Sequence, residues 1–341
     1  MKGWRSRAVR TVPILVAGLV LLLLGTVLVG WLSGSARDRF TDAASIELGL
    51  AAEVSPPTRS DGSRSLGSIE PAWLEVGPYG PVPRIAPDGR RPLVVHARPF
   101  DPHDPRPKVA LVVGGLGLQD RLTSRAIDLP GAVSLHFSAY ATGLSEWAER
   151  ARDSGHEVLL DLPMEPLDYP ATDPGPHLLL ADNPPGDNLD RLAWLLARAP
   201  GYIGVAGSGG RFAGSPQAAA VLGELARRGL GFVELGSDRL AGTAGALGLA
   251  YVATAAAIDE EPSAAAIDRS LAALEAAALA SGGALGLAEA YPVSLERLEL
   301  WVATLDTKGL ALAPVSAFLI GRLASLPGQS NHVQPTSRFQ G

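Results

Sequence analysis

The chain begins with one long apolar run, and further along its apolar and polar residues alternate in shorter segments. No charged residue occurs from Thr11 to Leu32, and this run has about the 20 residues that a helix needs to cross a bilayer. Four basic residues precede it: Lys2, Arg5, Arg7 and Arg10. Because basic residues favour the cytoplasmic side, the pattern predicts a transmembrane helix over 11–32, with residues 1–10 in the cytoplasm.

A cleaved signal peptide is the alternative, because the small residues Ser33 to Ala36 follow the apolar run. The run is longer than the roughly 7 to 15 apolar residues of a signal peptide, which favours a retained anchor. We therefore expect a single-pass protein of the inner (cytoplasmic) membrane, with its globular part in the periplasm.

Residues 33–107 are rich in Pro, Gly and Ser from Ser55 onward and show no sustained apolar period, which predicts a spacer. The last part, Pro92 to Asp101, could lie as a strand or strap against the domain. The polar tail 327–341 is predicted to be disordered.

From Lys108 to Leu326, short apolar runs alternate with segments that carry helix-start and helix-end residues. The expected helices are bracketed by Ser215 and Gly229, by Ser263 and Gly282, and by Ser294 and Gly309. The expected strands are Val109–Val113, Val133–Phe137, Val158–Leu162, Ile203–Ala206, Gly231–Leu235, Leu249–Ala253, Ala284–Ala288 and Leu310–Ala313.

Strands joined by helices of this length are parallel, because each connection must cross back to the same edge. Seven or eight of them over residues 108–326 predict an α/β domain built as a closed or nearly closed (β/α) barrel; a doubly wound open sheet is the alternative. A site in a barrel lies in the loops that follow the strands.

The amino-acid composition excludes several kinds of site and partner. Hydrophobic residues make up 47% of the chain and aromatic residues only 6%, so Ala, Leu and Val must build the core. The chain contains no Cys, which excludes disulfides, thiolate metal ligands and a cysteine nucleophile. The net charge of -6 comes without a basic stripe, so nucleic acid is not an expected partner.

The loops after the predicted strands hold the candidate site residues. Gly114 and Gly115 follow the first strand and suit either a tight turn or close approach to an anion. Asp161, Met164 and Glu165 follow the third strand, and the carboxylates there could act as acid, base or metal ligand, or the Pro-rich loop could simply be rigid.

The later strands end on further polar residues. Ser208 and Arg211 follow the fourth strand, and Glu289 and Tyr291 follow the seventh. Ser208 could be a nucleophile only if a base reached it. Other acidic residues at strand ends, including Glu234, Asp238 and Asp259, could equally be favoured there by the helix dipoles that follow them.

Four motifs carry a resemblance to a known family: Gly155–Leu160, Leu162–Pro166, Asp173–His177 and Pro200–Val205, in this order. With them, Lys108 to Leu323 resembles the divergent polysaccharide deacetylases, relatives of the metal-dependent carbohydrate esterases that remove acetyl groups from glycans. The resemblance implies an incomplete (β/α) barrel of seven or eight strands. In active relatives it also implies a divalent metal, usually zinc, bound by an Asp and two His, with another Asp as base.

The chain departs from that pattern at the expected ligands. Gly114 and Gly115 replace a pair of aspartates, Ser208 stands nearest to a missing histidine, and Glu289–Pro292 replaces His-Pro-His-Pro. Zinc needs three protein ligands and an open position, so these losses predict no metal and no cofactor. A rebuilt carboxylate set would suit Mg or Ca; its candidates are Asp161, Glu165, Glu234, Asp259 and Glu289.

We therefore expect a membrane-tethered protein of carbohydrate metabolism in the cell envelope that has lost metal-dependent catalysis. Its expected partner is envelope polysaccharide or peptidoglycan, or an envelope protein that it scaffolds. The predicted binding residues are Gly114, Gly115, Met164, Ser208, Arg211, Glu289 and Tyr291. The alternative is an active deacetylase with Asp161 or Glu165 as base and with Tyr291 or Ser208 near the oxyanion.

Overall fold

The computed structural model describes residues 65–254 and 256–325. The predicted transmembrane helix at 11–32 and the tail at 327–341 lie outside these residues and stay predictions. Within the two described ranges, no helix combines the length and the apolar character that crossing a membrane requires.

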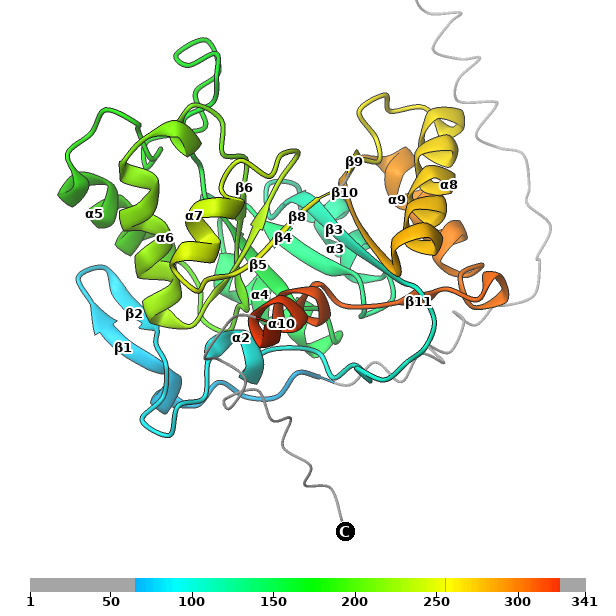
Figure 1. Cartoon of the computed structure of the whole chain (residues 1–341), viewed down its shortest axis with the longest axis horizontal. Helices are drawn as coiled ribbons and strands as arrows, with labels where there is room; N and C mark the ends of the chain where they lie inside the picture. Colours follow the sequence, from blue (N-terminus) through cyan, green and yellow to red (C-terminus); the bar gives the residue numbers. More distant parts are fainter. Residues whose placement is uncertain (1–64, 255, 326–341) are drawn as a thin grey trace, which may run out of the picture. The chain divides into compact units, whose positions relative to one another are not determined.

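The domain is built on one sheet whose paired strands are all parallel (Figure 1). Its strands are β3 (Lys108–Leu116), β4 (Ser134–Phe137), β5 (Val158–Asp161), β6 (Gly204–Gly207), β7 (Gly231–Glu234), β8 (Ala250–Ala253), β9 (Ala256–Ala257), β10 (Gly283–Glu289) and β11 (Ala311–Leu312). Each apolar run predicted as a strand forms one, which confirms the β/α reading of the sequence.

The sheet curls into a nearly closed barrel. Its order is β8-β7-β6-β5-β4-β3-β10-β9, and β11 pairs with the start of β3. The two ends of this order, β8 and β9, follow each other in the chain, so together they occupy one place in the wall and give a barrel of seven strands. Among the described strands no ladder joins β8 to β9 or β10, and the wall has a seam there.

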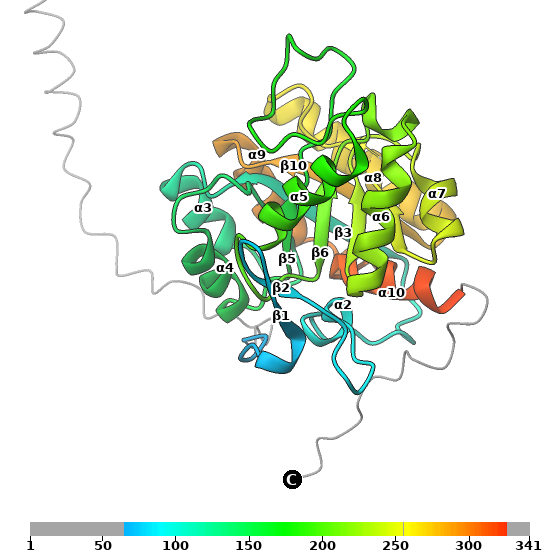
Figure 2. The same cartoon turned by 90° about the vertical axis from the view of Figure 1, so that its left-hand side faces the viewer.

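Helices surround the barrel on its outer side (Figure 2). They are α3 (Asp120–Ile127), α4 (Leu144–Asp153), α5 (Pro185–Leu196), α6 (Gln217–Arg228), α7 (Ala241–Ala246), α8 (Ala264–Ser281) and α9 (Pro292–Val302), whereas α10 (Val315–Ser325) lies at one end of the barrel. The predicted C-terminal end of α6 and both predicted ends of α8 are confirmed. Helix α6 ends at Gly229 with φ +70°, and the Ser263 side chain accepts a hydrogen bond from the amide of Ala266 at the start of α8.

The last predicted bracket, Ser294 to Gly309, is wrong at both ends. Helix α9 begins at Pro292, because proline suits the first turn of a helix and Tyr291 takes the extended conformation of an N-cap. The Ser294 hydroxyl donates to Asp259 and caps nothing. Gly309 ends a separate short 3-10 helix, Asp306–Lys308.

Strand residues alternate between two hydrophobic layers. Along β3, Val109, Leu111 and Val113 pack outward under the helices, whereas Ala110 and Val112 face inward. Helix α10 joins the inner layer through Leu319 and Leu323, among other residues. It sits at the amino ends of the strands, since a side chain added at the first residue of β7, Gly231, would meet Leu319. The opposite end of the barrel is therefore the open mouth.

Residues 65–107, predicted as part of a spacer, instead fold onto the domain. Strands β1 (Leu74–Gly77) and β2 (Gly80–Pro83) form an antiparallel hairpin, and the predicted strap contains a short helix, α2 (Pro92–Val95). Trp73 and Leu93 are buried. These few apolar anchors hold a Pro-rich segment that has no period of its own, which is why the sequence pattern did not reveal it.

A buried carboxylate ties these parts together. Glu157, directly before β5, is fully buried and accepts hydrogen bonds from the amides of Arg98 (2.8 Å) and Ser316 (3.0 Å). It also accepts from the hydroxyls of Ser134 and Ser316. Burial raises the pKa of Glu157, and these donors oppose the rise. The carboxylate thus joins the segment after α2, strand β4 and the start of α10.

Replacing Glu157 with alanine should strongly destabilise the domain. The change strands several buried donors, each costing roughly 1–3 kcal/mol, so we expect the free energy of unfolding to fall by about 3 kcal/mol or more. Urea denaturation of the full chain in detergent measures it. The exposed Glu149→Ala on α4 should stay within about 0.5 kcal/mol of the parent, and equal effects of the two changes would contradict the assignment.

Candidate binding site at the barrel mouth

Four strands each send one inward-facing residue to the mouth. Leu135 and Phe137 belong to the outer layer, so His136 between them faces the interior. By the same alternation, Gly114 of β3, Asp161 of β5 and Glu289 of β10 continue the inward rows of their strands. The fold therefore gathers these four positions from widely separated parts of the sequence.

The two glycines make room for the polar groups. A Cβ placed on Gly114 would lie 3.0 Å from Oε1 of Glu289 and 3.3 Å from Nδ1 of His136. A Cβ on Gly115 would lie 2.6 Å from Oε2 of Glu289, and Gly115 has φ +70°, which disfavours other residues. Gly115 thus suits a tight turn, and Gly114 lets the carboxylate of Glu289 and the imidazole of His136 approach the backbone of β3 closely.

The electrostatics of this cluster are unusual for a protein interior. His136 is only 7% exposed, and neither of its ring nitrogens has a hydrogen-bond partner among the described residues. The nearest charged atom is Oδ1 of Asp161, 3.5 Å from Nε2. Burial raises the pKa of Glu289; His136 opposes that rise, whereas the charges of Asp259 and Asp161 add to it.

Two of the predicted site residues instead fix the loop after β5. Glu165 is buried, accepts a hydrogen bond from the amide of Ala181 (2.7 Å) and pairs with Arg211, which also binds Asp182. Met164 is buried next to Gly207. Glu165 is therefore engaged by donors on both sides and is poorly placed to act as a base.

The remaining candidates divide into exposed rim residues and carboxylates that accept hydrogen bonds from the protein itself. Ser208 and Tyr291 are exposed at the rim. Glu234 accepts from the amides of Arg239 and Leu240 and from the hydroxyl of Tyr251. Asp259 accepts from the Glu289 amide and the Ser294 hydroxyl. Of the five carboxylates considered for a rebuilt site, only Asp161 and Glu289 approach the same imidazole.

Sequence analysis missed His136. It lies inside a short apolar run, where a lone histidine looks like a core residue. The alternation of side chains along a strand, here called parity, could have revealed it. Its neighbours Leu135 and Phe137 are the large apolar residues that pack under the helices. Parity places His136 on the inner face, one strand from Gly114.

The residues at the mouth do not fit a zinc ion of the kind that the family resemblance implies. Residues 65–254 and 256–325 contain no group of three or more His, Asp or Glu side chains that could hold a metal ion. The positions expected to supply ligands carry Gly114, Gly115 and Ser208, which offer no carboxylate or imidazole. No metal-dependent step is therefore derived for this chain.

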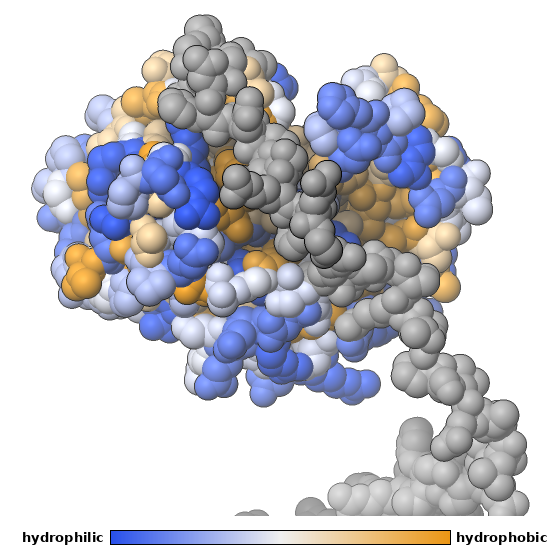
Figure 3. All heavy atoms as spheres, turned by 90° about the horizontal axis from the view of Figure 1, so that it is seen from below, coloured by the Kyte–Doolittle hydropathy of each residue, from blue (hydrophilic) through white to orange (hydrophobic). Residues whose placement is uncertain are grey.

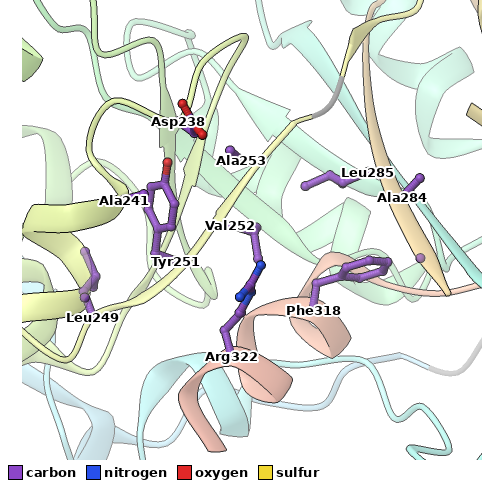
Figure 4. Close-up of a pocket in the computed structure, with 12 residues that line it drawn as sticks. Asp238, Ala241, Leu249, Tyr251, Val252, Ala253, Ala284, Leu285, Phe318 and Arg322 are labelled. Atoms are coloured by element: carbon purple, nitrogen blue, oxygen red, sulfur yellow. The ribbon is translucent and has the colours of Figure 1, made fainter. Parts of the chain in front are cut away.

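A second hollow lies at the seam of the barrel, away from the mouth cluster. It has a volume of about 490 Å³ and lies between α7, β8, the start of β10 and α10 (Figure 4). Tyr251, Phe318 and Arg322 are among its lining residues, and none of the four inward mouth residues lines it. Seen from below, the surface is hollowed between the lobe of α5–α7 and the lobe of α8 and α9 (Figure 3).

Comparisons with known proteins agree with the resemblance seen in the motifs. A profile of the family described as divergent polysaccharide deacetylase matches residues 111–319. An uncharacterized protein from Agrobacterium tumefaciens C58 is similar in structure, with a TM-score of 0.67, 37% identity and coverage of 69% of this chain and 98% of that one. A protein from Enterococcus faecalis V583 described as a cellobiose-phosphate cleavage protein aligns with a TM-score of 0.44 and 12% identity, over 61% and 97% of the two chains. No curated protein matches.

The contacts of Glu165 predict a structural role. Glu165→Gln should weaken the pair with Arg211 and the acceptor for the Ala181 amide, which costs about 1–2 kcal/mol of stability. Hydrogen–deuterium exchange should rise at residues 177–183. The exposed Asp168→Asn in the same loop is the control and should leave this exchange unchanged. Unaltered exchange in Glu165→Gln would contradict the role.

Proposed function

Because this chain belongs to the divergent polysaccharide deacetylase family, we propose that it binds an envelope polysaccharide at its barrel mouth without metal-dependent removal of acetyl groups. The proposal rests on the residues that line the mouth. Glycines and a serine occupy the positions where the family resemblance expects metal ligands, and the buried imidazole of the mouth, His136, lies 3.5 Å from the carboxylate of Asp161.

The polar groups of the mouth suit a ligand rich in hydroxyl groups. The carboxylates of Asp161 and Glu289 accept hydrogen bonds, and the glycine backbone permits close approach. Exposed apolar side chains stand on the loops that follow the same strands: Leu118 after β3, Leu167 and Tyr169 after β5, and Tyr291 after β10. Such side chains can pack against the C–H faces of sugars while the polar groups below orient them.

The location is part of the proposal. A retained helix over 11–32 would hold the domain on the periplasmic side of the inner membrane, next to peptidoglycan. A glycan partner agrees with the family, and an envelope protein partner remains the other ligand class for the same surface.

One observation favours a second function. The imidazole of His136 lies 3.5 Å from Asp161 in a buried setting, and a histidine oriented by a carboxylate is a common general base. Deacetylation would then use Asp161 and His136 without a metal. Glu165, the other base considered, is held by Arg211 and the Ala181 amide.

Metal analysis combined with an acetate assay tests the proposed function. The full chain, purified in detergent and incubated with zinc, should retain well under one zinc ion per chain and release no acetate from acetylated glycan oligomers, while binding those or related oligomers. Stoichiometric zinc with turnover would contradict the proposal. Turnover without metal that disappears in His136→Gln would establish the second function instead.

Adding a methyl group at Gly114 should weaken glycan binding. Gly114→Ala places a methyl group 3.0 Å from Oε1 of Glu289, so the carboxylate must shift; we expect affinity to fall about tenfold, equivalent to about 1.4 kcal/mol. Gly186→Ala is the matched control, because a Cβ there meets nothing within 4 Å. Isothermal titration compares the two variants, and equal affinities would place the ligand elsewhere.

A further inference from the structure

We infer that the mouth cluster of His136, Asp161 and Glu289, packed beside Gly114, receives the ammonium group of a de-N-acetylated amino sugar. The inference rests on the proposed function, and it names the chemical class of glycan that the mouth prefers. It rests on which hydrogen-bond donors and acceptors the residues at the bottom of the mouth provide.

Among the described residues no Lys or Arg forms an ion pair with Asp161 or Glu289, and the basic group beside these carboxylates is the imidazole of His136. The arginines of the neighbouring loops have acceptors of their own. Arg211 binds Glu165 and Asp182, and Arg239 donates to the carbonyl of Gly210. A cationic ligand group would supply the missing charge.

His136 is an independent sign of a ligand. A buried polar atom without a partner costs roughly 1–3 kcal/mol, so native proteins seldom keep one without a reason. The Nδ1 atom of His136 and the Oε1 atom of Glu289 both lie close to Gly114, where a Cβ would stand 3.3 Å and 3.0 Å from them. A ligand group that enters the mouth beside Gly114 would meet the imidazole and the carboxylate together.

An ammonium group suits this cluster better than the other functional groups of envelope glycans. It offers three N–H donors, which match one carboxylate oxygen from Asp161, one from Glu289 and an imidazole nitrogen of His136 in its acceptor form. An acetamide carbonyl or a phosphate would instead place its oxygen atoms against two carboxylates, where repulsion opposes binding. The geometry therefore favours the amine over its acetylated form.

The test compares glucosamine oligomers with N-acetylglucosamine oligomers of the same length. The full chain in detergent is titrated with each near neutral pH. We expect the glucosamine oligomer to bind about tenfold more tightly, as one charged hydrogen-bonded group provides. Glu289→Gln and Asp161→Asn should each remove most of that preference, and far-UV circular dichroism checks that both variants are folded.

Glu299→Gln on the exposed side of α9 is the matched control and should keep the preference, because it removes the same charge from a site away from the mouth. A preference that persists in Glu289→Gln and Asp161→Asn would reflect general attraction to an acidic protein and would overturn the inference. Equal or tighter binding of the acetylated oligomer would overturn it too, while leaving the proposed function in place. Failure of both oligomers to bind the parent chain would instead count against the proposed function.

Discussion

The buried carboxylate of Glu157 is the constraint on which the arrangement of the domain depends. Carboxyl groups are costly to bury, and donors from three separate segments converge on this one and offset the cost. One of these donors is the Ser316 amide in the first turn of α10, where the helix dipole favours negative charge. Helix α10 fills the inner layer at this end of the barrel, which leaves the opposite end as the open mouth.

At that end, most acidic side chains stabilise the fold. Glu234, Asp259 and Glu165 each accept hydrogen bonds from backbone amides, so the loops around the mouth are fixed by their own carboxylates. Asp161 and Glu289 differ, because the group they approach is an imidazole without hydrogen-bond partners. The hydrogen bonds thus distinguish the acids that fix the loops around the mouth from Asp161 and Glu289, which face its interior.

Sequence reasoning reached the barrel because buried parallel strands are continuous apolar runs, and each one predicted between Val109 and Ala313 is present. It failed where few residues decide the structure, as in 65–107, where Trp73 and Leu93 anchor a segment without periodicity. Gly114, Gly115, Asp161 and Glu289 could be placed at the barrel mouth because strand ends are readable in a sequence. The spatial neighbours of His136 could not be predicted, since they depend on which strands become neighbours in space.

The seam between β8 and β10 makes the wall mechanically uneven. Elsewhere, widening the barrel would break ladder hydrogen bonds, whereas at the seam side chains such as Phe318 bridge the two edges. Packing contacts are individually weak and yield gradually, while a ladder separates cooperatively. The barrel is therefore compliant along one line, and its diameter can adjust there without loss of register in the strands that carry His136 and Asp161.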